Sequence, residues 1–205
     1  LREFLKEKKG DHLNFLDAGC GDGEHLKWME NYSKNLYGSD YNPTRISRAK
    51  SVKSAKLCIA DLTNFPAKDN SFDFIFFNHV LEHIHNDKKA LEEIYRITKP
   101  GGMVMLGVPN EGAFFWQLAY KLQPQSREIS DHVQFYTIKN LSPKCQKAGF
   151  SIQEAKPIGW GLPHWWLDSQ IRGYKWIDDF FEFIGKNLFP LQATSLYMIL
   201  RKNNA

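Results

Sequence analysis

The strongest constraint on the fold of this chain is the regular alternation of short apolar runs with segments of helical periodicity. Residues 72–80, FDFIFFNHV, are apolar almost throughout, as expected of a strand buried on both faces. Residues 87–98 follow with apolar side chains at helical spacing, and residues 103–108, MVMLGV, again have the composition of a strand. Further strands are predicted at 14–19, 35–40, 56–61, 150–158 and 195–202. This order predicts βαβ units, and hence a doubly wound α/β fold with a mostly parallel sheet.

Length and cysteine content narrow the class of protein. A chain of 205 residues suits one α/β domain, so residues 1–205 are expected to form a single domain. The three cysteines (Cys20, Cys58 and Cys145) are odd in number and widely spaced, which is typical of a reduced, cytoplasmic chain without a disulfide framework or a structural zinc site. No apolar run approaches the roughly 18 residues that span a bilayer. The opening LREFLKEKKG lacks the apolar core of a signal peptide.

The segment 17–23, D-A-G-C-G-D-G, follows a predicted strand and opens a predicted helix. Its glycines permit a tight turn and let the backbone approach a ligand, and open α/β sheets bind cofactors at such turns. Dinucleotide enzymes use G-x-G-x-x-G, but Glu24 stands in place of the third glycine. Asp17, two residues before the first glycine, suits the ammonium group of S-adenosylmethionine (SAM) and would suit a pyrophosphate poorly. A tight turn that binds nothing is the alternative interpretation.

Two further acids follow predicted strands. Asp40 ends the second strand, where its carboxylate can accept hydrogen bonds from both hydroxyls of a ribose. Asp61 ends the third strand and can accept from an adenine amino group, with the N–H of Leu62 beside it. Acids at strand ends are commonly solvated loop residues or helix caps. Three of them at successive strand ends, beside a glycine turn, indicate a site for an adenosyl cofactor.

On these residues the chain resembles the class I SAM-dependent methyltransferases, in particular the group called methyltransferase type 11. The resemblance runs from about residue 14 to 108. FLDAGCGDGEHL resembles the first motif of the family, YGSDYNP the segment with the ribose-binding acid, and ADLTNFPAKDNSFDFIFFNHVLEHI the adenine-binding acid with the fourth strand. EEIYRITKPGGMVMLGVPN resembles the next helix and strand, and IKNLSPKCQKAGFSI the region of the sixth strand.

The resemblance implies a cofactor, a set of binding residues and a topology. The cofactor would be SAM, with S-adenosylhomocysteine as the product. The implied cofactor-binding residues are Asp17, Gly19, Cys20 and Gly21 at the methionine end, Asp40 at the ribose, Tyr41, Asp61 and Leu62 at the adenine, and Asn78 near the methionine moiety. The implied fold is a Rossmann-like, seven-stranded sheet of order 3-2-1-4-5-7-6, with the last-numbered strand antiparallel and helices on both faces.

Histidines are the candidate catalytic bases. Methyl transfer from a sulfonium is an in-line displacement that depends on positioning and requires no metal ion, so none is expected. An oxygen nucleophile must also lose a proton, and histidine titrates in the useful range. His79 and His83 follow the fourth predicted strand, and His132 precedes the region of the sixth; the last two resemble family positions. The alternative is that these histidines cap helices or pack at a rim. The other four (His12, His25, His85 and His164) are expected to be structural.

An aromatic segment at about 160–190 contains four of the six tryptophans, Trp160, Trp165, Trp166 and Trp176. Helical spacing of apolar residues predicts an amphipathic helix packed on the domain. The segment could instead form a lid over an apolar acceptor, or a dimer interface. Peripheral membrane contact is not favoured, because acids occupy the polar side where an anionic membrane would attract Lys and Arg: Asp178, Asp179 and Glu182.

The sequence therefore predicts an enzyme that transfers a methyl group from SAM to an oxygen or nitrogen nucleophile of a small molecule, such as a lipid-like or glycan acceptor. The net charge of +4 is small and the charges are interspersed, so no nucleic-acid partner is expected. Two rival functions remain open. One is a SAM-fold module that binds without catalysis, and the other is an NAD-dependent oxidoreductase.

Overall fold

The computed structural model describes residues 12–125, 127, 131–160, 170 and 174–204. Seven strands form one sheet, in the order β3-β2-β1-β4-β5-β7-β6. Their bounds are β1 Asn14–Ala18, β2 Asn35–Asp40, β3 Ala55–Ile59, β4 Phe72–Asn78, β5 Thr98–Pro109, β6 Ser151–Ile158 and β7 Ser195–Arg201. The first five strands are parallel, whereas β7 runs antiparallel to both β5 and β6. The predicted strand order and the doubly wound α/β class are confirmed.

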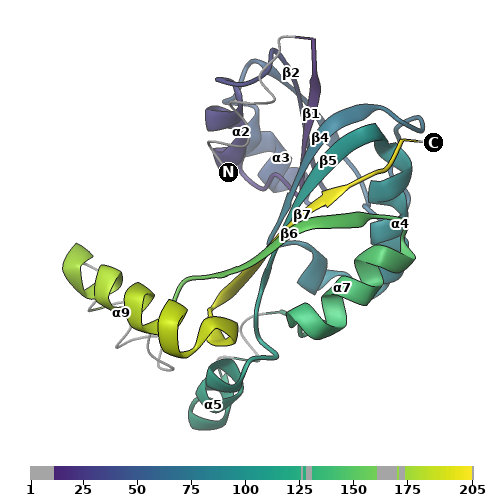
Figure 1. The fold of residues 1–205 in the computed structure, drawn as a ribbon. Helices are drawn as coiled ribbons and strands as arrows, with labels where there is room; N and C mark the ends of the chain where they lie inside the picture. The colour runs from purple at the N-terminus through teal and green to yellow at the C-terminus, as the bar shows by residue number, and fades with distance from the viewer. Residues whose placement is uncertain (1–11, 126, 128–130, 161–169, 171–173, 205) are drawn as a thin grey trace.

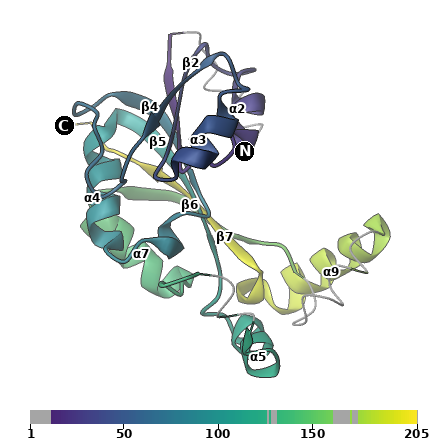
Figure 2. The ribbon, with the colours of Figure 1, turned by 180° about the vertical axis from the view of Figure 1, so that it is seen from behind.

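Helices lie on both faces of this sheet (Figures 1 and 2). The described α-helices are α2 Glu24–Met29, α3 Pro43–Ala49, α4 Asp87–Ile97, α5 Phe114–Leu122, α7 Ile138–Lys147 and α9 Lys175–Leu188, and two short 3₁₀ helices are η1 Leu81–His83 and η2 Pro190–Gln192. Local chemistry starts several of them. Asn42 caps α3 by accepting from the amides of Thr44 and Arg45, and Thr137 with Asn140 forms a capping box on α7.

Alternate side chains of the central strands supply two separate cores. Phe74 and Phe76 pack with apolar residues of α2 and α3 on one face. Ile75 and Phe77 pack with apolar residues of α4 and α7 on the other. Both faces of β4 are therefore covered, which is the physical reason for its continuous apolar run.

Several strand boundaries differ from the sequence-based prediction by one or two residues, and the start of β5 differs by five. β5 begins at Thr98 and not at residue 103, because Thr98 already pairs with Phe72. Gly101 and Gly102 lie at a shift in register, since the next pair is Phe74 with Met103. β3 ends at Ile59, so Asp61 lies two residues beyond the strand. Local composition does not reveal where pairing with a neighbouring strand begins or ends.

The carboxyl ends of the parallel strands meet at one edge of the sheet. Pro109 at the end of β5 pairs with Ser195, and Ser195 pairs with Ile158 at the end of β6. Helices α5 and α9 therefore leave the sheet at this edge, and both views show them beyond it at the same end of the molecule (Figures 1 and 2). Among the described residues, no helix has the length and apolar character needed to cross a membrane. All three cysteines are free thiols.

Candidate functional site

The glycine turn after β1 is folded by backbone contacts with the end of β2. The amides of Gly19 and Cys20 both donate to the carbonyl of Ser39, at 2.8 and 2.7 Å. Gly19, Gly21 and Gly23 have φ values of 83°, 52° and 86°, a region that favours glycine. A Cβ on Gly19 would lie 2.2 Å from the side chain of Val80, whereas one on Gly21 would meet nothing within 4 Å. The turn is therefore packed at its start and open at Gly21, where a ligand can approach.

Asp17 supplies a buried carboxylate next to this turn. It is 1% exposed, and its Oδ2 has no hydrogen-bond partner among the described residues. Nδ1 of His25 lies 3.8 Å from that oxygen. Burial, reinforced by the charge of Asp40, raises the pKa of Asp17 to about 8. A cation at this point would compensate the desolvated carboxylate, so the site fits the ammonium of a methionine moiety.

Asp40 is buried and holds the turn in place. Its Oδ2 accepts from the amide of Gly21 at 3.0 Å, and its Oδ1 accepts from the amide of Asn42 at 2.8 Å. Each carboxylate oxygen can accept a second hydrogen bond, so the assignment to the ribose stays a prediction. Tyr41, predicted to flank the adenine, is 77% exposed and available for stacking.

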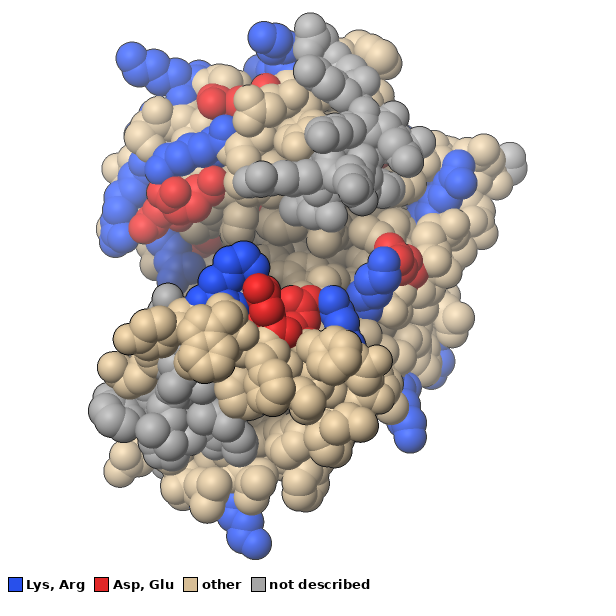
Figure 3. All heavy atoms as spheres, turned by 60° about the vertical axis from the view of Figure 1, so that its left-hand side comes forward, with Lys and Arg blue, Asp and Glu red and all other residues tan. Residues whose placement is uncertain are grey.

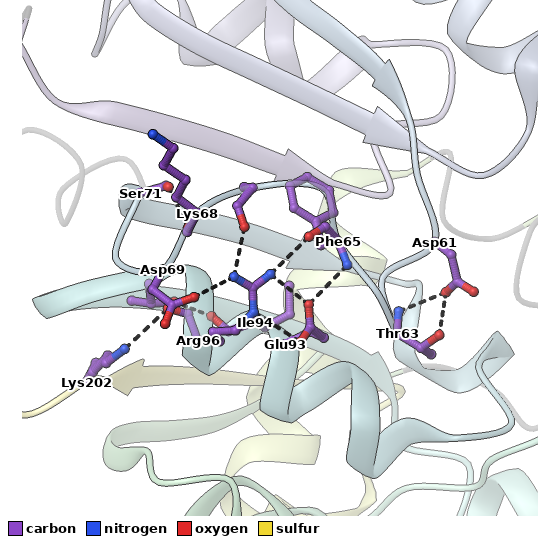
Figure 4. Close-up of polar contacts among 12 residues, drawn as sticks. Asp61, Thr63, Phe65, Lys68, Asp69, Ser71, Glu93, Ile94, Arg96 and Lys202 are labelled. Carbon is purple, nitrogen blue, oxygen red and sulfur yellow. Dashed lines mark hydrogen bonds and ion pairs between the residues drawn. The ribbon is translucent and has the colours of Figure 1, made fainter.

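The remaining predicted cofactor residues differ in how much of each side chain is free to contact a ligand. Oδ1 of Asp61 accepts from the backbone and hydroxyl of Thr63, at 2.8 and 2.9 Å, so this acid stabilises its own turn (Figure 4). Leu62 is buried, as is Cys20, whose amide is engaged by Ser39 and whose thiol has a pKa raised by burial. Oδ1 of Asn78 is buried without a hydrogen-bond partner among the described residues, and it lies where a Cβ on Gly107 would clash.

The three predicted catalytic histidines gather around two buried glutamates beyond β4 and β5. Nδ1 of His79 lies 3.3 Å from Oε1 of Glu82, and Nδ1 of His132 lies 2.6 Å from Oε1 of Glu111. The rings of His83 and His132 meet edge to face, with centroids 4.8 Å apart. Glu82 and Glu111 are both almost fully buried. The structure thus brings together residues from three separate segments of the chain.

Backbone strain marks the same cluster. Among the described residues, non-glycine positive φ occurs at Asn70, His79 and Asp131, and the last two belong to or adjoin the cluster. The carbonyl of Asp131 lies 3.2 Å from Nδ1 of His83. Strained backbone is retained where the surrounding structure over-determines it, which is common at functional sites.

His132 is the best oriented of the three histidines. Its Nδ1 faces the carboxylate of Glu111. The N–H on that nitrogen therefore donates a hydrogen bond to the carboxylate, and Nε2 keeps a free lone pair. Burial alone would lower the pKa of His132, but the hydrogen bond and charge of Glu111, with the charge of Glu82, outweigh it and raise the pKa. Tyr120 also donates to Oε1 of Glu111 and helps to fix this carboxylate.

Three residues of the site were not predicted from the sequence: Glu82, Glu111 and His25. Glu82 adjoins His83, and Glu111 lies two residues beyond β5, so position close to a strand end was a usable indication for both. His25 was expected to be structural, yet it lies beside Asp17 and stacks edge-on against Phe76. Its pKa is lowered, first by burial and then by the charge of His79. His164 lies outside the described residues.

Figure 3 shows a hollow on the face that α9 borders, with acidic and basic side chains along its edge. Described ion pairs on α9 are Lys175 with Asp179, and Lys186 with Glu182. The exposed large apolar side chains concentrate on α5, α9 and their flanks: Phe114, Leu122, Tyr174, Trp176, Phe180, Phe183, Leu188, Phe189 and Leu191. This edge of the sheet therefore combines a charged border with extensive apolar surface.

Known proteins resemble the chain in sequence and fold. A family model described as a methyltransferase domain matches residues 16–106. A malonyl-(acyl-carrier protein) O-methyltransferase of Buchnera aphidicola is 30% identical over 138 residues, which cover 65% of this chain and 54% of that protein. A probable tRNA methyltransferase 9B of Bos taurus is 32% identical over 111 residues, which cover 53% of this chain and 24% of that protein. The chain thus spans about half, or less, of the length of these relatives.

A solved structure extends the likeness to almost the whole chain. One chain of the complex between the Haloferax volcanii Trm112 methyltransferase activator and a methyltransferase superposes with a TM-score of 0.73 at 17% identity. The match covers 99% of this chain and 88% of that one. At this identity the likeness concerns the fold alone. Residues 16–106 thus match a methyltransferase domain, and the related sequences, the strand order and the buried acid beside the glycine turn resemble those of the class I SAM-dependent methyltransferases.

Proposed function

We propose that this chain transfers a methyl group from SAM to an oxygen or nitrogen nucleophile of a small-molecule acceptor. The observation that carries the proposal is the orphaned, buried carboxylate of Asp17 beside a glycine turn that is open at Gly21. It favours a cationic ligand over the pyrophosphate of a dinucleotide, which argues against an oxidoreductase. The histidine–glutamate cluster argues against a module that only binds, because binding SAM does not require it.

The cofactor would be held by residues at three strand ends. Asp17 would pair with the methionine ammonium, and Asp40 would accept from the ribose hydroxyls while keeping the turn in place. Tyr41, Asp61 and Leu62 would enclose the adenine. When bound, SAM supplies an electrophilic methyl group on a sulfonium centre. The task of the chain is then to align the acceptor and to remove its proton.

His132 is the proposed general base for a hydroxyl acceptor. Its ring is 15% exposed, and Glu111 holds the tautomer that leaves Nε2 free to accept a proton. His83 stacks against it and His79 contacts Glu82, so both would act by positioning. Because the pKa of His132 is raised above 6.5, the rate of methyl transfer should rise with pH through a single ionisation above that value. The rate is measured in a chelating buffer, so that metal ions do not affect the ionisation of His132.

The acceptor is proposed to be apolar in part. The exposed aromatic side chains of α5 and α9 would form a wall of the acceptor site, as proposed for the segment 160–190. Trp165 and Trp166 of that segment lie outside the described residues. A nucleic-acid acceptor is the second candidate, because one relative is named as a tRNA methyltransferase.

The test is calorimetric titration of the chain with SAM, S-adenosylhomocysteine and NADH. Both adenosyl ligands should bind and NADH should not. Replacing Asp40 by Ala should weaken SAM binding by about 1–3 kcal/mol, the cost of unpairing buried polar groups. Transfer of a labelled methyl group is then measured on apolar hydroxyl compounds, amines, glycans and tRNA.

Each arm of this test can contradict the proposal. A folded chain that binds NADH but neither adenosyl ligand would overturn the cofactor. Adenosyl binding without transfer to any acceptor class would support the non-catalytic module. Transfer to tRNA alone would replace the small molecule by a nucleic acid.

A further inference from the structure

We propose that Glu82, His83 and His132 bind a single divalent transition-metal ion, with Zn²⁺ as the representative ion. Each of the three side chains offers one ligand atom, and these atoms lie within 4.8 Å of one another. An ion held at about 2.1 Å keeps its ligands roughly 3–4 Å apart, so small rotations of the side chains complete the site. Methyl transfer from SAM does not need this ion, and nothing in the proposed cofactor site predicts it.

In both imidazoles, Nδ1 faces a hydrogen-bond acceptor. Nδ1 of His83 faces the carbonyl of Asp131 at 3.2 Å, and Nδ1 of His132 faces the carboxylate of Glu111 at 2.6 Å. An acceptor on one ring nitrogen fixes the proton there and leaves the lone pair of Nε2 for a metal. A carbonyl or carboxylate behind each ligating histidine is the usual outer-shell arrangement in protein metal sites.

Glu82 supplies the independent indication that a cation belongs here. Its side chain is 1% exposed, and neither carboxylate oxygen has a hydrogen-bond partner among the described residues. The described ion-pair contact of this carboxylate is His79, whose Nδ1 lies 3.3 Å from Oε1. A buried carboxylate without hydrogen bonds is costly unless a positive charge compensates it. A divalent ion between Glu82 and the two imidazoles would do so.

Backbone hydrogen bonds also join the two segments that carry the ligands, although Glu82 and His132 are far apart in sequence. The carbonyl of Glu82 accepts from the amides of Val133 and Gln134, at 2.9 and 3.1 Å. These two backbone hydrogen bonds connect the segment that carries His132 to η1, which carries Glu82 and His83. A site assembled before the ion arrives loses less ordering entropy when the ion binds.

The ligand set determines the class of ion. Two imidazoles and one carboxylate suit Zn²⁺ and similar transition metals, whereas Mg²⁺ and Ca²⁺ prefer all-oxygen sites. Three protein ligands leave a coordination position for water or for an acceptor oxygen. Bound there, an acceptor hydroxyl would have its pKa lowered by the ion, and His132 would serve as a ligand instead of as the base. This use of the ion rests on the proposed methyl transfer, but binding of the ion does not.

The experiment is a competition titration of Zn²⁺ between the untagged full chain and a fluorescent chelator, in the absence of SAM. One equivalent should bind. Replacing His83 by Ala or Glu82 by Gln should weaken binding by at least about tenfold, as should Glu111→Gln, which removes the charge behind His132. His85→Ala is the matched control, because His85 is an exposed histidine two residues from His83 and outside the cluster. Co²⁺ should give a visible absorption band that His83→Ala abolishes.

Wild-type affinity in the His83→Ala and Glu82→Gln variants, or no Zn²⁺ binding by the folded wild-type chain, would overturn the proposal. His83 is exposed, so its variant should fold, and circular dichroism with thermal unfolding checks this for every variant. SAM binding is measured separately in a chelating buffer. A wild-type chain that binds Zn²⁺ but not SAM would refute the proposed function and leave the metal site standing. A wild-type chain that binds SAM but not Zn²⁺ would refute the metal site and leave the proposed function standing.

Discussion

Individual buried carboxylates are the most informative residues in this structure. Asp17, Glu82 and Glu111 each place at least one oxygen in the interior without a hydrogen-bond partner among the described residues. Desolvating such a group is costly. A buried carboxylate without hydrogen bonds therefore indicates that a ligand binds to it or that it takes up a proton. All three are carried at or just beyond the carboxyl ends of β1, β4 and β5.

The raised pKa of Asp17 leads to a prediction about protons. At pH 7 the ligand-free chain holds this carboxyl mainly protonated, because its pKa is about 8. The SAM ammonium favours the carboxylate, so binding at pH 7 should release about one proton, and binding well above pH 8 should release almost none. Calorimetric titration in buffers of different ionisation enthalpy measures the number directly.

Asp17→Asn is the matched variant for this measurement, since it keeps the shape of the side chain and cannot titrate. It should release no proton and should bind SAM about 10- to 100-fold more weakly, the worth of a hydrogen bond to a charged group. Undiminished proton release by Asp17→Asn would assign the proton to another group, such as His25.

At the scale of elements, one arginine ties the β3–β4 connection to helix α4. Arg96 donates to the carbonyls of Phe65 and Ala67, at 2.9 and 2.8 Å, and to the carboxylate of Asp69 at 2.7 Å (Figure 4). Glu93, one turn earlier on α4, accepts from Arg96 and from the amide of Phe65. The connection also carries Asp61 and Leu62, so this network positions the proposed adenine site.

Arg96→Met should lower the free energy of unfolding by about 1–3 kcal/mol, because two backbone carbonyls and Glu93 lose their donor. It should also weaken SAM binding. Lys88→Met on the same helix is the control, since Lys88 is exposed and its pair with Glu92 spans 3.7 Å, an interaction worth about 0–1 kcal/mol. Chemical denaturation compares the two variants, and equal losses would show that Arg96 has no special role.

Helix α9 is anchored to the sheet by a close contact at a glycine. A Cβ on Gly185 would lie 1.9 Å from the ring of Trp160, which is buried and donates from Nε1 to the carbonyl of Phe189 at 3.0 Å. The short distance shows that the indole packs directly against the helix backbone. The spacing of apolar residues predicts this helix, but it does not predict the contact between Gly185 and Trp160.

Gly185→Ala should therefore destabilise the chain by about 1–3 kcal/mol through overpacking, although alanine favours helix by about 1 kcal/mol over glycine. Thermal unfolding measures the change. Asn187→Ala on the same helix gains helix propensity without meeting the indole and should be neutral or stabilising. A stabilised Gly185→Ala would mean that α9 does not pack on Trp160.

At the scale of the whole molecule, the glycine turn, the histidine–glutamate cluster and the apolar helices share one edge of the sheet. The pairing of Pro109 with Ser195 and of Ser195 with Ile158 sends both α5 and α9 to this edge. Side chains as large as Trp176 and Phe183 are 71% and 66% exposed there. The arrangement places apolar surface beside the proposed acceptor site.

Replacing Trp176 and Phe183 together by Ser should raise the KM for acceptors with long apolar parts, by about tenfold or more, because each buried aromatic contact is worth roughly 1.5–3 kcal/mol. The kcat and the SAM affinity should stay close to wild type, since neither residue belongs to the proposed catalytic or cofactor site. Asn187→Ser, an exposed polar change on α9, is the control. An unchanged KM would remove α9 from the acceptor site.

The sequence by itself determined the strands, the glycine turn and the helix caps. These depend on short-range patterns: β4 reads as buried on both faces, Gly19 and Gly21 meet a local backbone requirement, and Asn42 caps the helix that it precedes. The strand order followed from resemblance to a family. Asp40 was predicted as a ligand residue, but its hydrogen bond to the amide of Gly21, 19 positions away, was not predicted.

Only the tertiary structure decided the second half of the site. His83 and Asp131 are 48 positions apart, and Glu111 and His132 are 21 apart. Their meeting depends on how η1 and the chain beyond β5 fold over the sheet edge. Burial of Glu82 and exposure of the α9 aromatics are likewise set by neighbours distant in sequence. Local patterns carry no information on such contacts, because free energy of burial belongs to the packed molecule and not to any single segment.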